Sequence, residues 1–352
     1  MTIGKSLQAA AGNAGETPYV LSFVYNTVTS NYAALKISIK DGSVLDAHDT
    51  SANRNFYPYS AVWVPSQAKF IGMTNSGTSS GSVHSYDPDT YQWTLLNSAT
   101  SGGFSAVFQL QRNENIAGGY SKSGVGDIGA LLVASGNYST SSLPVFSTNS
   151  QNFWPVVSNN DSYLWTLTGN YDLRKNTTTS TTLTKATTYR STSSDSLTFG
   201  SLLIGQDSNL YVTSYDKIGK YPLTGGNTPA TATLSVGYQS GYGYSGYYGT
   251  STQYGYIIVG TTTGGVYSIS ESSFTKVSQL SSSTTGLTGV RQVLYDMDSD
   301  TVFLFESSGK ICAITVSSTG SLSLKWKFTV PAGYSTFAGA FVKSNAIDWL
   351  PI

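Results

Sequence analysis

A short apolar run that follows a polar turn recurs seven times along this chain at nearly constant spacing. With Phe70, Ile116, Leu164, Leu210, Ile257 and Val302 as landmarks, successive runs are separated by about 46, 48, 46, 47 and 45 residues. This is the period of a β-propeller blade, in which a small sheet repeats around a central channel. The seven runs are Tyr19–Leu21, Phe70–Gly72, Asn115–Ala117, Tyr163–Trp165, Leu210–Val212, Tyr256–Ile258 and Thr301–Phe303.

Each period predicts four strands separated by turn residues. The second period contains four β-favouring runs divided by Pro65-Ser66-Gln67, Asn75-Ser76-Gly77 and Asp87-Pro88-Asp89. Its predicted strands are 59–64, 70–73, 82–86 and 92–96, and those of the third period are 104–110, 116–120, 128–134 and 143–146. The only segment that suggests a helix is 5–11.

The two ends of the chain predict how the ring closes. Pro18 to Asn26 aligns with the second strand of a blade that has no inner strand before it, whereas 334–342 aligns with an inner strand that has no blade after it. Pairing them removes two free sheet edges. We therefore expect an all-β fold, a single seven-bladed propeller of four-stranded blades closed by its terminal strands. Its parts are an N-terminal arm at 1–17, the propeller at 18–345 and a tail at 346–352.

Composition narrows the class of protein. Only 11% of the 352 residues are charged, against roughly 25% in ordinary soluble domains, and the formal net charge is zero. No basic surface for nucleic acid is indicated, and no run approaches the roughly 20 apolar residues of a membrane span. The N-terminus lacks the pattern of a signal peptide. Cys312 is the only cysteine, so an intramolecular disulfide is excluded, and its strand context predicts a buried side chain.

Several motifs resemble known propeller repeats. The segment from Ser82 through Tyr86-Asp87-Pro88 to Trp93 resembles the second half of a kelch repeat, and Gly118-Gly119 resembles the kelch double glycine. The stretch from Gly309 to Trp326 is similar to the repeat of pyrroloquinoline-quinone-type propellers. These resemblances imply the architecture only, since such repeats occur in enzymes, adhesins and scaffolds.

The abundance of Ser, Thr, Tyr and Gly resembles the composition of structural proteins of archaeal viruses. A surface hydrated by hydroxyl groups changes little with acidity, whereas a surface of carboxylates loses its charge at low pH. With no signal peptide in view, this resemblance implies a location on a virion or an extracellular surface.

Two groups of residues suggest metal ligands. Asp296, Asp298 and Asp300 have the alternate spacing that begins many calcium loops, but the loop's glycine is replaced by Thr301 and its final bidentate acid is missing. A polar turn is the preferred interpretation. The segment from Asp46 to Asp49 includes His48, and His84 lies on a predicted strand, but no third ligand converges on either histidine. We therefore predict no metal and no organic cofactor.

The most unusual local composition is the Tyr-Gly segment 238–249. Tyr238, Tyr242 and Tyr244 could form a binding surface, because exposed tyrosines give rigid amphipathic contacts. The alternative is that 244–250 is the inner strand of the sixth blade. Three sequons, at Asn137, Asn160 and Asn176, lie in predicted turns. The threonine-rich stretch 175–182 could be a strand or a loop.

Taken together, the sequence predicts a non-enzymatic structural or attachment protein that acts through loops on one face of the ring. Its partners would be other proteins of an external assembly or a surface glycan. Two alternatives remain open: a lectin-like carbohydrate-binding propeller and an enzyme that acts on a polysaccharide. No catalytic residue is assigned, because few acids are present and most lie in predicted turns.

Overall fold

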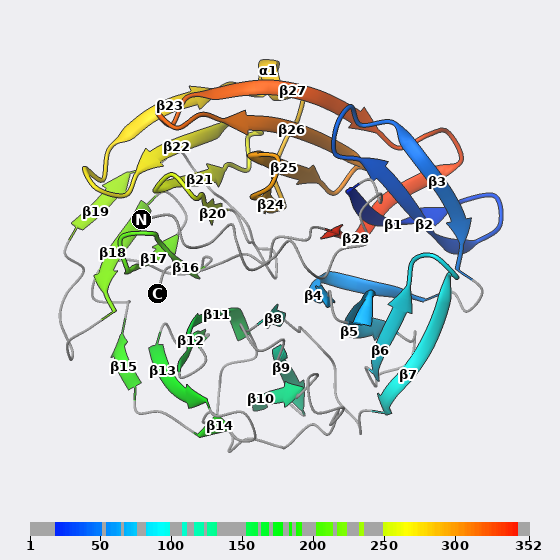
Figure 1. The fold of residues 1–352 in the computed structure, drawn as a ribbon, viewed down its shortest axis with the longest axis horizontal. Coiled ribbons are helices and arrows are strands. Elements are labelled where there is room, and N and C mark those ends of the chain that lie inside the picture. The colour runs from blue at the N-terminus through cyan, green and yellow to red at the C-terminus, as the bar shows by residue number, and fades with distance from the viewer. Residues whose placement is uncertain are drawn as a thin grey trace.

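The structure is a computed structural model, and it describes a set of ranges that cover most of the predicted strands. They are residues 18–50, 54–64, 67–75, 82–98, 108–110, 116–122, 125–131, 153–160, 163–168, 172–178, 183–184, 188–191, 202–213, 217–223, 232–235 and 249–343. Within these ranges the chain forms antiparallel sheets arranged in a ring, a β-propeller (Figure 1). The single helix among them, α1, spans Ser282–Thr285.

The described strands form seven sheets, numbered here in chain order. Sheet 1 contains β28 (Tyr334–Lys343), β1 (Tyr19–Asn26), β2 (Asn31–Ser38) and β3 (Val44–Asp49). Sheet 2 contains β4 (Asn55–Val64), β5 (Lys69–Asn75), β6 (Ser82–Asp87) and β7 (Gln92–Ser98). Sheet 3 contains β8 (Phe108–Leu110), β9 (Ile116–Lys122) and β10 (Val125–Leu131). Sheet 4 contains β11 (Phe153–Asn160), β12 (Tyr163–Thr168), β13 (Asp172–Thr178), β14 (Leu183–Thr184) and β15 (Thr188–Ser191).

The remaining three sheets continue the ring. Sheet 5 contains β16 (Leu202–Ile204), β17 (Asn209–Thr213), β18 (Lys217–Pro222) and β19 (Ala232–Ser235). Sheet 6 contains β20 (Gly249–Ser251), β21 (Tyr256–Gly260), β22 (Val266–Ser270) and β23 (Lys276–Leu280). Sheet 7 contains β24 (Gln292–Asp296), β25 (Thr301–Glu306), β26 (Lys310–Val316) and β27 (Leu322–Thr329). In each sheet the first strand lies nearest the centre of the ring (Figure 1).

The predicted closure is confirmed. β28 pairs with β1 from Tyr19↔Lys343 to Asn26↔Tyr334, so the last described strand is the inner strand of the first sheet. The predicted third strand of sheet 3 at 128–134 is instead found at Val125–Leu131, because its pairing with β9 begins at Val125↔Lys122. The predicted strand 143–146, the helix 5–11, the arm at 1–17 and the tail at 346–352 lie outside the described residues, so the domain boundaries stay predictions.

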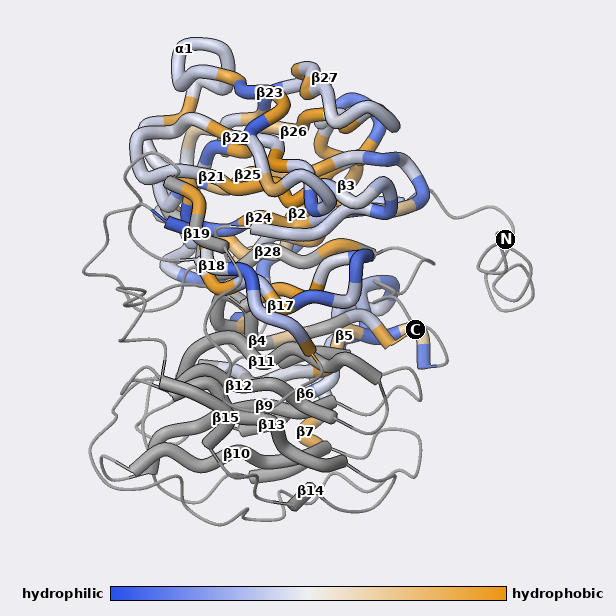
Figure 2. Tube along the Cα trace, turned by 90° about the vertical axis from the view of Figure 1, so that its left-hand side faces the viewer, coloured by the Kyte–Doolittle hydropathy of each residue, from blue (hydrophilic) through white to orange (hydrophobic). Residues whose placement is uncertain are grey.

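Alternate residues of β1 face different neighbours, which explains its nearly continuous apolar sequence. Val20 and Val24 belong to a buried cluster shared with sheet 7, whereas Leu21 and Phe23 belong to one shared with sheet 2. Successive side chains of a strand point to opposite faces, and here both faces are covered. Hydrophobic colour likewise runs along much of β25 and β26 in Figure 2. No helix among the described residues is long and apolar enough to cross a membrane.

Cys312 is buried in sheet 7, as predicted. It packs in the cluster shared by sheets 6 and 7, and burial raises the pKa of its thiol to about 12. A thiol that stays protonated and has no access to solvent is unreactive. The residue therefore serves as a small apolar side chain of the core.

Trp326 joins the last sheet of the ring to the first. Its indole nitrogen donates a hydrogen bond of 2.9 Å to the carbonyl oxygen of Ile39 in the turn between β2 and β3. Gly42 of that turn lies against the same ring, and a Cβ atom there would come within 2.7 Å of it. Gly42 also has a φ of 76°, a conformation that favours glycine. The turn is thus shaped to receive the indole.

We expect Trp326→Phe to destabilise the protein by about 1 to 3 kcal/mol more than Trp93→Phe, measured by urea unfolding. Trp93 is the matched control, because its buried indole nitrogen has no hydrogen-bond partner among the described residues. Replacing Trp326 leaves a buried carbonyl without its donor, whereas replacing Trp93 leaves no such group. Equal losses for the two variants would contradict the role given to the Trp326 hydrogen bond.

Candidate functional site

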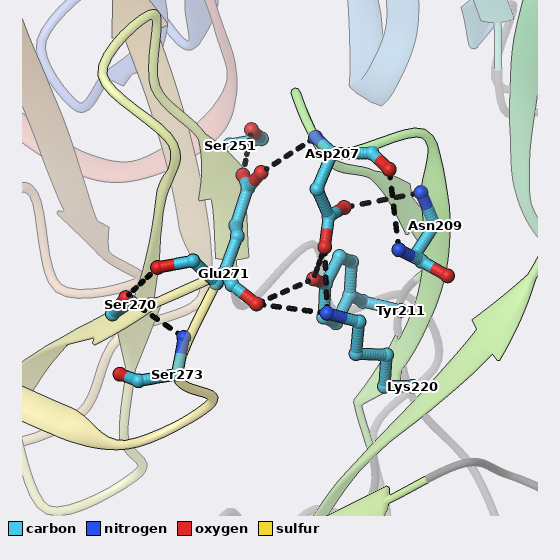
Figure 3. A network of polar contacts seen from close by, with 9 residues as sticks. Asp207, Asn209, Tyr211, Lys220, Ser251, Ser270, Glu271 and Ser273 are labelled. Atoms are coloured by element: carbon cyan, nitrogen blue, oxygen red, sulfur yellow. Dashed lines mark hydrogen bonds and ion pairs between the residues drawn. The ribbon is translucent and has the colours of Figure 1, made fainter.

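A network of charged and hydroxyl groups lies between sheets 5 and 6. It joins the turn between β16 and β17 to the turn between β22 and β23 (Figure 3). Both turns follow strands that run in the same direction, so they lie at the end of the ring where the inner strands finish, which we call the carboxyl face. The opposite end, where the inner strands begin, is the amino face.

Asp207 is fixed by a compact polar turn. Its Oδ1 accepts a hydrogen bond of 3.1 Å from the backbone N–H of Asn209, and the Asn209 side chain donates back to the Asp207 carbonyl at 3.2 Å. Such side-chain to backbone bonds are typical of Asp and Asn in turns. Gly205 begins this turn because a Cβ atom there would lie 2.6 Å from the Tyr211 ring and 2.8 Å from the Glu271 carboxyl carbon.

Lys220 and Tyr211 are cross-strand partners in β18 and β17, and both bind the other carboxylate oxygen of Asp207. Lys220 Nζ lies 2.6 Å from Asp207 Oδ2, and the Tyr211 hydroxyl donates to the same oxygen at 2.7 Å. Burial alone would raise the pKa of Asp207, but the hydrogen bonds from Lys220, Tyr211 and Asn209 outweigh it and lower the pKa. Asp207 is therefore ionised at neutral pH.

Glu271 closes the network from sheet 6 and is only 1% exposed. Its carboxylate accepts hydrogen bonds from the Ser251 hydroxyl at 2.6 Å and from the Asp207 backbone N–H at 3.1 Å. Its carbonyl oxygen accepts a bond of 2.8 Å from Lys220. Burial raises the pKa of Glu271, and the negative charge of Asp207 raises it further. The hydrogen bonds to the carboxylate lower the pKa, but the net shift is upward. The cluster thus holds two acids with pKa values displaced in opposite directions.

This arrangement has two layers with different access. The side chains of Asp207 and Lys220 are 22% and 15% exposed, whereas Glu271 is sealed behind them. An ionised carboxylate beside an ammonium group can take a proton from a bound water and stabilise negative charge that develops nearby. Clusters of displaced pKa values are typical of functional sites, although they also occur in structural ion pairs.

The acidic run in sheet 7 forms a turn, which was the preferred interpretation. Asp300 accepts hydrogen bonds from the hydroxyls of Tyr254 at 2.6 Å and Tyr295 at 3.1 Å, and from the Gln253 amide. Asp296 accepts its bonds from Ser299. Asp298 lies between them in the same turn. Across the described residues no group of three or more His, Cys, Asp or Glu side chains could hold a metal ion.

The two histidines lie in different surroundings. His48 is exposed and stacks on Tyr91, with ring centroids 4.0 Å apart. Asp46 and Asp49, its predicted companions, bind elsewhere: Asp49 accepts from Asn26 at 3.0 Å, and Asp46 accepts from the next backbone N–H at 2.8 Å. His84 is buried, with Nδ1 2.8 Å from the Thr74 hydroxyl. The structure does not bring the histidines together.

The other predicted site residues fall partly or wholly outside the described residues. Tyr238, Tyr242, Tyr244 and Asn137 are outside them. Asn160 is the last residue of β11, and Asn176 lies inside β13, so the expectation of a turn at Asn176 is wrong. The threonines that follow Asn176 favour a strand, and β13 indeed extends to Thr178. The inner strand of sheet 6 is described only at Gly249–Ser251, which overlaps the end of the predicted 244–250.

Sequence reasoning did not identify the network. Asp207 and Asn209 have the residue types of an ordinary polar turn, and Glu271 carries no local signal. Asp207 and Glu271 are in contact but lie 64 positions apart in the sequence, and Lys220 and Glu271 lie 51 positions apart. The one usable signal was that Lys220 is a charged residue within a strand of a chain that has few charges.

Comparisons with known proteins support the fold. No protein-family model and no curated protein matches this sequence. Among solved structures, the periplasmic gluconolactonase of Pseudomonas aeruginosa is 14% identical, with a TM-score of 0.63, over 92% of this chain and 98% of that one. A candidate 6-phosphogluconolactonase of Bacteroides fragilis is 12% identical, with a TM-score of 0.61, over 94% and 99%. AztD of Citrobacter koseri is 10% identical, with a TM-score of 0.53, over 93% and 98%.

These likenesses show a propeller, and not the kelch-type or pyrroloquinoline-quinone-type repeat in particular. They also correct the expectation of a non-enzymatic structural or attachment protein on a virion, because several of the similar structures are named as lactonases. That expectation came from composition, which describes how a surface is hydrated and not what its turns can bind. The location outside the cell and the partners stay predictions.

We expect Glu271→Gln to gain stability relative to the wild type as the pH rises above 4.5, the ordinary pKa of a glutamate. The raised pKa means that folded Glu271 holds its proton more tightly than the unfolded chain does, so the wild type loses free energy of unfolding in this range. The measurement is urea unfolding of both proteins across a pH series.

Glu306→Gln is the control with the opposite sign. Burial would raise the pKa of Glu306, but hydrogen bonds from Ser308 and Thr288 lower it. The free energy of unfolding of the wild type should therefore increase relative to that of this variant as the pH rises toward 4.5. Slopes of the same sign for the two variants would contradict the assignment.

Proposed function

We propose that this protein is a hydrolase of a sugar-derived lactone, with its active site at Asp207, Lys220 and Tyr211. The observation that carries the proposal is the partly exposed Asp207–Lys220 pair, 2.6 Å apart, with the buried Glu271 behind it. The similar structures named as lactonases support the choice of substrate class. The proposal shares its enzymatic character with the alternative of an enzyme that acts on a polysaccharide, but its substrate is a small lactone.

Hydrolysis of a lactone needs a base and an electrostatic partner for the carbonyl oxygen. Water adds its hydroxyl group to the carbonyl carbon, the bond from that carbon to the ring oxygen breaks, and the ring oxygen takes the proton. Asp207 fits the base, because it is ionised and its Oδ1 accepts only one hydrogen bond among the described residues. A carboxylate oxygen accepts two, so Oδ1 has capacity for the proton of the attacking water.

Lys220 and Tyr211 divide the remaining tasks. The Lys220 ammonium stabilises the negative charge that forms on the carbonyl oxygen of the substrate. Tyr211 holds Asp207 Oδ2 at 2.7 Å and so fixes the direction in which Oδ1 points. Glu271 is a positioning residue, since its carbonyl oxygen binds Lys220 and its carboxylate binds the backbone of Asp207. Full burial keeps Glu271 from touching a substrate.

We expect Asp207→Asn to lower the hydrolysis of glucono-δ-lactone by about 10²- to 10⁴-fold in kcat, because the base is lost. Proton release above the spontaneous rate measures the activity, at a temperature where melting curves show both proteins folded. Asp89→Asn is the matched control: it removes one carboxylate of a lysine pair at another sheet interface, 3.5 Å from Lys36, and should retain activity.

Two results would overturn the proposal. One is a wild-type protein that accelerates neither glucono-δ-lactone nor 6-phosphogluconolactone hydrolysis above the spontaneous rate. The other is an Asp207→Asn variant as active as the Asp89→Asn control. Tyr211→Phe adds a graded check, because it keeps the base but removes one of its supports. Its loss of activity should be smaller than that of Asp207→Asn.

A further inference from the structure

The part of the chain that surrounds the proposed active site carries very little charge. From 221 to 275 the sequence has a single charged residue, Glu271, and no lysine or arginine. This stretch includes the end of β18 and the strands β19 to β22. The first three strands of sheet 6 therefore bring no cation to the site.

The cations on either side of this stretch are already engaged or point away. Lys220 lies 2.6 Å from Asp207, which balances its charge. Lys217 is three positions earlier in β18, so its side chain points to the opposite face of sheet 5. Lys276 lies on the outer strand β23, where its ammonium is 4.6 Å from the centre of the Tyr267 ring. These three are the only lysines or arginines among the described residues of sheets 5 and 6.

The backbone N–H groups of the Asp207 turn are also taken. The N–H of Asp207 donates to the Glu271 carboxylate at 3.1 Å. The N–H of Ser208 donates to the Gly205 carbonyl at 3.1 Å. The N–H of Asn209 donates to Asp207 Oδ1, also at 3.1 Å. A turn that binds phosphate directs such N–H groups at its ligand, whereas these three are directed at the protein itself.

The carboxylates make the site unfavourable for a second anion. Asp207 and Lys220 balance each other, and the carboxylate of Glu271 has no ion pair among the described residues. A phosphate monoester carries about −1.5 to −2 charges at neutral pH. It binds tightly where arginines, lysines or N–H groups compensate that charge. The described part of this site offers a phosphate no such group that is not already paired.

Hydroxyl groups border the site instead. Ser208 is exposed in the turn between β16 and β17, and Ser272 and Ser273 are exposed directly after Glu271. Figure 3 shows Ser270 and Ser273 on the sheet 6 side of the network. A serine hydroxyl both donates and accepts hydrogen bonds, as the hydroxyls of a sugar do. This border matches a neutral polyhydroxylated ligand but supplies no charge to a phosphate.

We infer that the site at Asp207 is specific for an uncharged, polyhydroxylated lactone and rejects lactones that carry a phosphate group. The inference rests on the proposed function and narrows its substrate class. It separates two chemistries that the names of the similar structures leave together, those of a gluconolactonase and a 6-phosphogluconolactonase. Rejection comes from repulsion by the carboxylates and from the lack of a compensating cation among the described residues.

The test compares kcat/KM for glucono-δ-lactone and for 6-phosphogluconolactone, with rates taken above spontaneous hydrolysis. We expect the wild type to prefer the neutral lactone by about 100-fold, because a like charge that is left unpaired strongly weakens binding. Salt screens this repulsion, so the preference should decrease as the ionic strength rises. The value of kcat/KM for the neutral lactone should stay constant over the same range.

Ser208→Lys adds a cation next to Asp207 and should raise kcat/KM for the phosphorylated lactone by about tenfold. Ser30→Lys is the matched control. Both serines are exposed and have nearly the same backbone φ, 59° at Ser208 and 58° at Ser30. Ser30 lies in the turn between β1 and β2 at the amino face, so Ser30→Lys should leave both kcat/KM values unchanged. Melting curves should show both variants folded.

Failure of the inference can be told apart from failure of the proposed function. If the wild type accelerates both lactones without preferring the neutral one, the inference is overturned and the proposed function stands. The inference is also overturned if Ser30→Lys raises kcat/KM for the phosphorylated lactone as much as Ser208→Lys does. If the wild type accelerates neither lactone, the proposed function fails and the inference fails with it.

Discussion

The pairing of β28 with β1 is the interaction on which the rest of the ring depends. It supplies sheet 1 with its inner strand, and the register from Tyr19↔Lys343 to Asn26↔Tyr334 sets where that strand begins. Without it, β1 would present a free edge toward the channel. The same pairing places Tyr334 beside Asn26 at the amino face. Closure therefore shapes the amino face as well as joining the two ends of the chain.

Neighbouring sheets are held together by a device that recurs in the turns between third and fourth strands. In each of four such turns one residue has a positive φ: Gly42, Tyr91, Phe274 and Gly320. Where that residue is aromatic, its ring packs on the preceding sheet, Tyr91 on His48 and Phe274 on Tyr211. Where it is glycine, an aromatic ring of the preceding sheet fills the space instead, Trp326 at Gly42 and Tyr256 at Gly320. At each of these four turns an aromatic ring from one of the two sheets therefore packs against the other sheet.

The fold was predictable from the sequence because the same pattern of apolar runs and turn residues recurs in each blade. An error in one strand, such as the predicted 128–134 of sheet 3, does not change the period. The residues of the candidate site, in contrast, do not recur from blade to blade, so no repeated pattern points to them. Asp207 and Asn209 form an ordinary polar turn, Lys220 alternates with apolar residues in a strand, and Glu271 follows a strand end. Nothing local distinguishes these residues, and only the packing of sheet 6 on sheet 5 brings them together.

The repeats also provide an internal comparison for the proposed active site. Lys36 in β2 occupies a place like that of Lys220 in β18, on a third strand beside the next sheet. Lys36 lies 4.0 Å from Asp46 of its own sheet, whose side chain is 37% exposed, and 3.5 Å from Asp89 of the next sheet, whose side chain is 52% exposed. Lys220 lies 2.6 Å from Asp207 of its own sheet, whose side chain is 22% exposed, and donates at 2.8 Å to the carbonyl of Glu271 of the next sheet. An exposed ion pair contributes little to the free energy of unfolding. The interface at Lys36 is therefore held together without a strong contribution from charged groups. The buried Glu271 and the close Asp207–Lys220 pair are therefore more than such an interface requires for stability, and burying charge is costly. The excess at the interface of sheets 5 and 6 therefore argues for a chemical role in addition to a structural one.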